Sequence, residues 1–84
     1  MARLIKVDGT IEKLKPAGKY LSLQELQKAV DGYIETVTVD KENLLIVNEE
    51  GRLKQLPVNK IATDMALQMI VGDVVLVKMS EMEQ

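Results

Sequence analysis

The sequence contains no cysteine and no histidine. Without cysteine the chain forms no disulfide, and without either residue it lacks the usual ligands of zinc, so we expect no metal site. These residues are also the strongest common nucleophile and the commonest general base. Of the two serines, Ser22 precedes a predicted helix and Ser80 lies in the polar tail. We therefore expect a protein that is not an enzyme and needs no cofactor.

Phenylalanine and tryptophan are also absent, which leaves Tyr20 and Tyr33 as the only aromatic residues. No apolar run approaches the roughly 20 residues of a membrane span, and the N-terminus lacks the apolar run of a signal peptide. The net charge of −2, from 11 basic and 13 acidic residues, argues against binding to duplex nucleic acid. We expect a soluble cytoplasmic protein that contacts neither a membrane nor duplex nucleic acid.

Turn signals and hydrophobic periodicity predict the order β-β-α-β-β-α-β. Asp8-Gly9 is a strong hairpin turn, and Ser22 with Glu25 forms a capping box before a helix that Gly32 would end in the left-handed conformation. Asn59 is suited to cap the second helix. The predicted strands are 2–7, 10–15, 33–39, 44–48 and 71–78, and the predicted helices are 23–30 and 59–67.

These elements predict an α+β fold in a single domain, residues 1–84. Five strands would form one mostly antiparallel sheet, with both helices packed on one face. The alternation changes phase between Ile34 and Val37, which is compatible with a β-bulge, and 52–56 is either a brief strand or an extended segment. Because a chain of 84 residues has a small core, we also expect a homo-oligomer, either a dimer or a tetramer.

The segment 47–66 gathers most of the polar candidates for a binding site. Arg52, Lys54 and Lys60 lie within nine residues. Asn59 and Thr63 stand at the start of the second predicted helix, and a helix N-terminus attracts anions. One interpretation is a pocket for a phosphate and a base; the other is a solvated basic segment before a helix cap.

The two tyrosines also allow two interpretations. Tyr20 and Tyr33 flank the first predicted helix, where each either covers a helix end or offers a ring on which a base stacks, worth roughly 1–3 kcal/mol per base. The residues alone therefore indicate a small-anion or nucleotide-binding module, or an interaction protein.

The sequence resembles a family of small proteins from phages and mobile elements, long described as a domain of unknown function. The resemblance covers roughly residues 20–77. It rests on the segments LSLQELQKAVDGYIE, LLIVNEEGRLKQLPVNKIATDMA and IVGDVVLV. The pattern is fairly specific only as a set. Asp31 departs from it, since the family has Gly-Gly-Tyr where this chain has Asp-Gly-Tyr.

Some short phage proteins of this kind are sponges that defeat the bacterial CBASS defence. They hold cyclic dinucleotides such as cyclic GMP–AMP without cleaving them, as symmetric oligomers. The resemblance implies the same immune-evasion role in the host bacterial cytoplasm; the alternative is inhibition of a host protein by direct binding. The distinctive polar positions of the family fall on Asn48, Glu49, Glu50, Arg52, Asn59, Lys60 and Thr63. Together with the residues above, the predicted ligand-binding set is Tyr20, Tyr33, Asn48, Arg52, Lys54, Asn59, Lys60 and Thr63.

Overall fold

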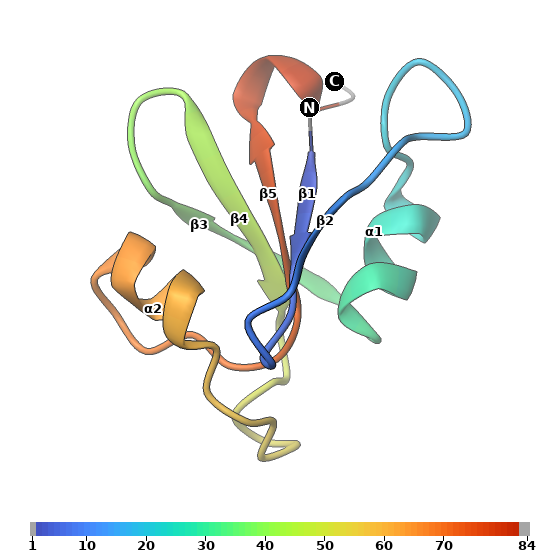
Figure 1. Cartoon of the computed structure of the whole chain (residues 1–84). Coiled ribbons are helices and arrows are strands. Elements are labelled where there is room, and N and C mark those ends of the chain that lie inside the picture. Colours follow the sequence, from blue (N-terminus) through green and yellow to red (C-terminus); the bar gives the residue numbers. More distant parts are fainter. Residues whose placement is uncertain (1, 83–84) are drawn as a thin grey trace.

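The computed structural model describes residues 2–82 and has the predicted order of elements (Figure 1). A short 3₁₀ turn, η1, follows the last strand. The elements are β1 (Arg3–Ile5), β2 (Ile11–Lys13), α1 (Leu23–Val30), β3 (Ile34–Thr38), β4 (Asn43–Asn48), α2 (Lys60–Ala66), β5 (Val74–Lys78) and η1 (Met79–Glu81).

The five strands form one sheet in the order β2-β1-β5-β4-β3, and every neighbouring pair is antiparallel. The predicted α+β fold is therefore confirmed. The last strand, β5, begins three residues later than predicted. Gly72 adopts a left-handed conformation with φ 79°, which separates β5 from Val71, whose backbone forms an isolated bridge with Val58.

The two helices lie on opposite faces of the sheet, so the prediction that both pack on one face is wrong (Figure 1). Ile46 of β4 packs in the core layer with Leu26 of α1. Its neighbour Leu45 packs in the other layer with Ala62 of α2. Successive side chains of a strand point to opposite faces, so the continuous apolar run of β4 supplies both layers. Such a run is typical of a strand that is buried on both sides.

Strand β3 contains no bulge, although the phase of its sequence allowed one. Its register with β4 is unbroken from Ile34 opposite Asn48 to Thr38 opposite Leu44. Ile34 packs against the layer under α1, whereas Val37 packs against the layer under α2. Because both faces of β3 are partly apolar, apolar residues occur in both phases of the alternation without a bulge.

Helix α1 begins as predicted. The Ser22 hydroxyl accepts a hydrogen bond from the Glu25 backbone N–H at 3.1 Å, and the Glu25 carboxylate accepts one from the Ser22 N–H at 3.0 Å. The C-terminal end differs from the prediction, because Asp31 rather than Gly32 takes the left-handed conformation, with φ 60°. Gly32 is needed for space: a Cβ there would lie 2.7 Å from Nδ2 of Asn48.

The capping box gives the stability of the fold a dependence on pH. Hydrogen bonds from the backbone N–H groups of Ser22 and then Ala17 lower the pKa of Glu25. Ionised Glu25 therefore stabilises the folded state above its ordinary pKa, and this contribution is lost as the pH falls through the lowered value. Glu25→Gln keeps the acceptor without the charge. We expect the variant to have a lower urea midpoint at pH 7, with the two midpoints converging below about pH 4. A difference that stays constant from pH 7 to pH 3 would contradict this role.

Candidate functional site

Asn48, at the end of β4, ties that strand to the end of α1. The residue is 5% exposed. Nδ2 donates to the carbonyl oxygens of Val30 and Asp31 at 3.0 and 3.1 Å, and Oδ1 accepts from the Glu50 N–H at 2.8 Å. Both amide hydrogens and the carbonyl oxygen are therefore engaged within the chain.

Asn59 has the same role at the start of α2, and here the side chain is completely buried. Oδ1 accepts from the Ala62 N–H at 3.1 Å, which confirms the predicted cap. Nδ2 donates to the carbonyl oxygens of Ile5 and Gly72, each at 2.9 Å. The amide thus joins α2, β1 and the segment before β5, and it presents no surface to a ligand.

Thr63 completes this internal network. Its hydroxyl accepts from the Ile70 N–H at 2.9 Å and donates to the Ile70 carbonyl at 3.2 Å. The hydroxyl holds the segment after α2 against the helix. Three of the predicted polar residues, Asn48, Asn59 and Thr63, therefore build the framework of this end of the molecule.

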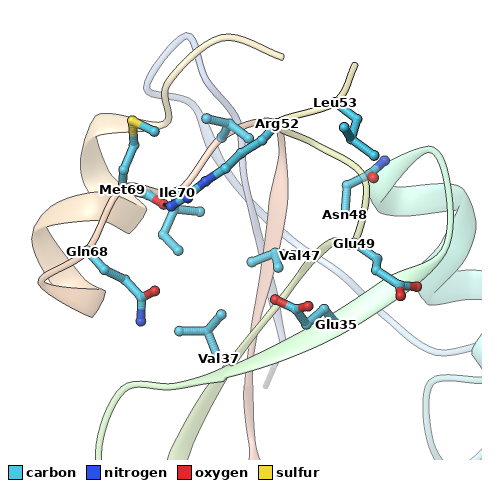
Figure 2. Close-up of a pocket in the computed structure, with 11 residues that line it drawn as sticks. Glu35, Val37, Val47, Asn48, Glu49, Arg52, Leu53, Gln68, Met69 and Ile70 are labelled. Carbon is cyan, nitrogen blue, oxygen red and sulfur yellow. Dashed lines mark hydrogen bonds between the residues drawn. The ribbon is translucent and has the colours of Figure 1, made fainter. Parts of the chain in front are cut away.

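Beside Asn48 lies an open cleft of about 320 Å³ on the face of the sheet that carries α2 (Figure 2). Val37 and Val47 of neighbouring strands form the apolar part that the sheet contributes. The loop after β4 lies on one side and the segment 68–71 on another. The cleft is lined by Glu35, Val37, Val47, Asn48, Glu49, Arg52, Leu53, Gln68, Met69, Ile70 and Val71.

Close packing of Gly51 positions the loop that carries Arg52. Gly51 is buried, and a Cβ there would lie 2.7 Å from Cγ2 of Val71. The Leu56 N–H donates to the Gly51 carbonyl at 3.0 Å, which closes a turn over 51–56. This segment is therefore a turn, and the prediction of a brief strand or extended segment is wrong.

The charged groups of the cleft are one guanidinium and two carboxylates. Nη2 of Arg52 donates to the Met69 carbonyl at a long 3.4 Å, so the exposed guanidinium is only loosely held. Figure 2 shows it at the Met69 end of the cleft, with the exposed carboxylates of Glu35 and Glu49 across the cleft from it. A ligand that carries both an anionic group and N–H donors matches this distribution of charge.

The other predicted basic residues lie outside the lining of this cleft. Lys60 is exposed on α2, where its Nζ lies 3.8 Å from the Asp64 carboxylate. Lys54 points to the end of α1, with its Nζ 3.5 Å from the Asp31 carbonyl oxygen. At the start of α2, the buried Asn59 side chain caps the Ala62 N–H and does not face a ligand.

The two tyrosines are not brought together with Arg52. Tyr20 lies with Pro16 and Ser80 in a separate hollow, and Nζ of Lys19 is 5.3 Å from the centre of its ring. Tyr33, just before β3, is 64% exposed. The single large site expected from the sequence is therefore distributed over three parts of the surface.

Sequence reasoning missed Glu35 and Gln68 as residues of the cleft. Glu35 carried a usable signal: it shares its face of the strand with Val37 and with Val39 just beyond β3, both of which pack against the core. A carboxylate in an otherwise apolar row is unusual. Gln68 gave no comparable signal, because the turn after α2 places it.

The fold and the cleft define a small α+β protein with an open polar site beside one helix. The chain belongs to the family described as "Domain of unknown function (DUF3846)", whose model matches residues 2–84. This confirms the predicted membership of a family of unknown function. No curated protein and no solved structure matches the chain. Among residues 2–82, no helix is long and apolar enough to cross a membrane, and no group of three acidic side chains is placed to hold a metal ion.

Proposed function

We propose that this protein binds a cyclic dinucleotide, such as cyclic GMP–AMP, and sequesters it without cleaving it, as a phage protein that evades bacterial immunity. The observation that carries the proposal is the cleft that sets the Arg52 guanidinium across from two carboxylates. A guanidinium binds phosphate through paired charge-assisted hydrogen bonds. The apolar surface of Val37 and Val47 accommodates the flat face of a base.

The two carboxylates of the cleft favour a base that carries N–H donors. Glu35 and Glu49 accept hydrogen bonds from N–H groups and repel a phosphate, so they suit the edge of a base. Guanine carries an exocyclic amino donor beside its ring N–H. We therefore propose that the guanine of cyclic GMP–AMP faces the carboxylates while a phosphate contacts Arg52.

The residues that line the cleft also favour binding over catalysis. The lining contains no serine, threonine, lysine, histidine or cysteine, so it lacks the hydroxyl, amine, imidazole and thiol groups that serve as nucleophiles. A protein that removes a signal by holding it needs only affinity and a sufficient concentration of sites.

The proposal is tested by calorimetric titration of cyclic GMP–AMP and cyclic di-AMP into the protein. We expect cyclic GMP–AMP to bind more tightly. Heat denaturation of the complex followed by chromatography should return the nucleotide intact. Absence of binding would refute the sequestration proposal, and a new product would show catalysis instead.

A second candidate is direct inhibition of a host protein, which one observation favours. Leu67 is 90% exposed and Leu53 is 84% exposed, and Met69 between the cleft and α2 is 49% exposed. Leu53 and Met69 line the cleft, and exposed apolar side chains that lie together are typical of protein interaction sites. Purification of the protein from a bacterial lysate would then recover a specific host protein, and Leu53→Glu with Leu67→Glu would abolish its recovery.

A further inference from the structure

The two edges of the sheet differ in how well they are protected from pairing with another strand. The edge strand β2 is three residues long, and Lys15 and Pro16 follow it closely. Short length, lysine and proline are the usual means of blocking an edge. The edge strand β3 has five residues, no lysine, no proline and no bulge. Within the described chain, β3 is therefore the edge that is open to pairing.

The backbone of β3 presents a regular set of groups at this open edge. The Glu49 N–H donates to the Tyr33 carbonyl at 2.8 Å, and the Val39 N–H donates to the Asn43 carbonyl at 3.0 Å. Hydrogen-bonded pairs alternate along an antiparallel ladder, so the odd-numbered residues 33–39 bond to β4. The N–H and C=O groups of Ile34, Thr36 and Thr38 consequently point away from the sheet.

We propose that β3 pairs antiparallel with β3 of a second copy, about a two-fold axis through Thr36. In this register Thr36 faces its own equivalent, and Ile34 faces Thr38 of the second copy. Each of these pairs exchanges two backbone hydrogen bonds. The outward-pointing groups of the strand are thereby all satisfied, and the two sheets become one.

The side chains are compatible with this register. Glu35, the only charged residue of β3, stands opposite Val37 of the second copy, so no two like charges are directly opposed. One step beyond the strand, the exposed Tyr33 stands opposite Val39 of the second copy. An aromatic residue opposite a β-branched residue is a favourable cross-strand pair, and the pairing covers a tyrosine that is otherwise 64% exposed.

The same pairing joins the two clefts into one two-fold symmetric site. Glu35 and Val37 line the cleft from β3 itself, at the proposed interface. A two-fold axis perpendicular to the sheet keeps the α2 faces of both copies on the same side. Each copy thus supplies half of the site, with its own Arg52. This part of the inference rests on the proposed function, since a cyclic dinucleotide has two nucleotide halves that suit two equivalent half-sites.

Thr36→Pro tests the pairing without breaking the chain's own ladder. Proline lacks an N–H, but the Thr36 N–H points away from β4, a position that tolerates proline. By light scattering at micromolar concentration, we expect twice the 9.4 kDa monomer mass for the wild type. Thr36→Pro should give the monomer mass, and the matched control Thr36→Val, which keeps the N–H, should remain dimeric. Circular dichroism checks that each variant is folded.

A charge-swap experiment tests the register itself. In a dimer of Thr36→Lys or of Thr36→Glu, two like charges would face each other across the axis. Each variant alone should therefore be monomeric, while an equal mixture of the two should be dimeric. A monomeric wild type, or a dimer that survives Thr36→Pro and both charged variants, would overturn the inference. No nucleotide enters these measurements. A dimer that binds no cyclic dinucleotide would therefore refute the proposed function alone, and a monomer that binds it would refute the pairing alone.

Discussion

Replacing Asn59 with alanine should lower the free energy of unfolding by about 3–7 kcal/mol, by our estimate from its three hydrogen bonds. Loss of a helix cap costs about 1 kcal/mol, and each buried carbonyl left without its partner costs about 1–3 kcal/mol. The carbonyls of Ile5 and Gly72 would both lose the amide that now lies 2.9 Å away. Urea unfolding followed by circular dichroism measures the change.

Asn59→Asp separates the cap from the two cross-links. Aspartate keeps the oxygen that accepts from Ala62, and it is an equally good cap. It replaces the donor nitrogen with an oxygen that faces two carbonyl oxygens in a buried position. If Asn59 acted only as a cap, Asn59→Asp would be as stable as the wild type and Asn59→Ala would lose only about 1 kcal/mol. We expect Asn59→Asp to be destabilised at least as much as Asn59→Ala.

Signals that act within a few residues made parts of this fold predictable. Ser22 and Glu25 are three positions apart, and their reciprocal bonds form as the spacing indicated. Asn59 capping α2 is a local contact of the same kind. The antiparallel pairing of β3 and β4 followed from the short turn between them. Each of these predictions needed only neighbouring residues, so the sequence was enough.

The hydrogen bonds by which Asn48 and Asn59 join distant segments were not predictable, because their partners are distant in sequence. Asn59 reaches Ile5, which lies 54 positions away, and Asn48 reaches Val30, which lies 18 positions away. Both residues were interpreted as polar groups available to a ligand. The end of a strand and a helix cap are common surface positions, and nothing local distinguishes an amide that points inward.

The prediction that both helices pack on one face was wrong, although the sequence contained a signal against it. The runs of β4 and β5 are apolar at successive positions, which indicates burial of both faces. Two helices are then needed on opposite sides, one above each face. The same arrangement separates α1 from the cleft beside α2, and with it Tyr20 from Arg52. The incorrect placement of the helices is therefore also the reason why the sequence placed Tyr20 and Arg52 at one site.

Arg52→Ala should weaken the binding of cyclic GMP–AMP by roughly ten- to a hundredfold, since each factor of ten corresponds to about 1.4 kcal/mol. Charge-assisted hydrogen bonds to phosphate contribute on the order of 1.5–3 kcal/mol. Arg52 is the basic residue among those that line the cleft. The side chain is exposed and makes one long bond within the chain, at 3.4 Å, so the variant should melt within a few degrees of the wild type.

Lys60→Ala is the matched control, since it removes the same charge from an exposed site eight positions further along the chain. The ammonium group of Lys60 lies beside Asp64 and outside the lining of the cleft. The affinity of Lys60→Ala for cyclic GMP–AMP should therefore equal that of the wild type. Arg52→Lys keeps the charge but loses the planar guanidinium. Its affinity for cyclic GMP–AMP should lie between those of the wild type and Arg52→Ala. If both alanine variants weakened binding equally, long-range charge rather than contact in the cleft would account for the affinity. If only Lys60→Ala weakened binding, the phosphates would lie along α2, and the cleft at Arg52 would not be the site.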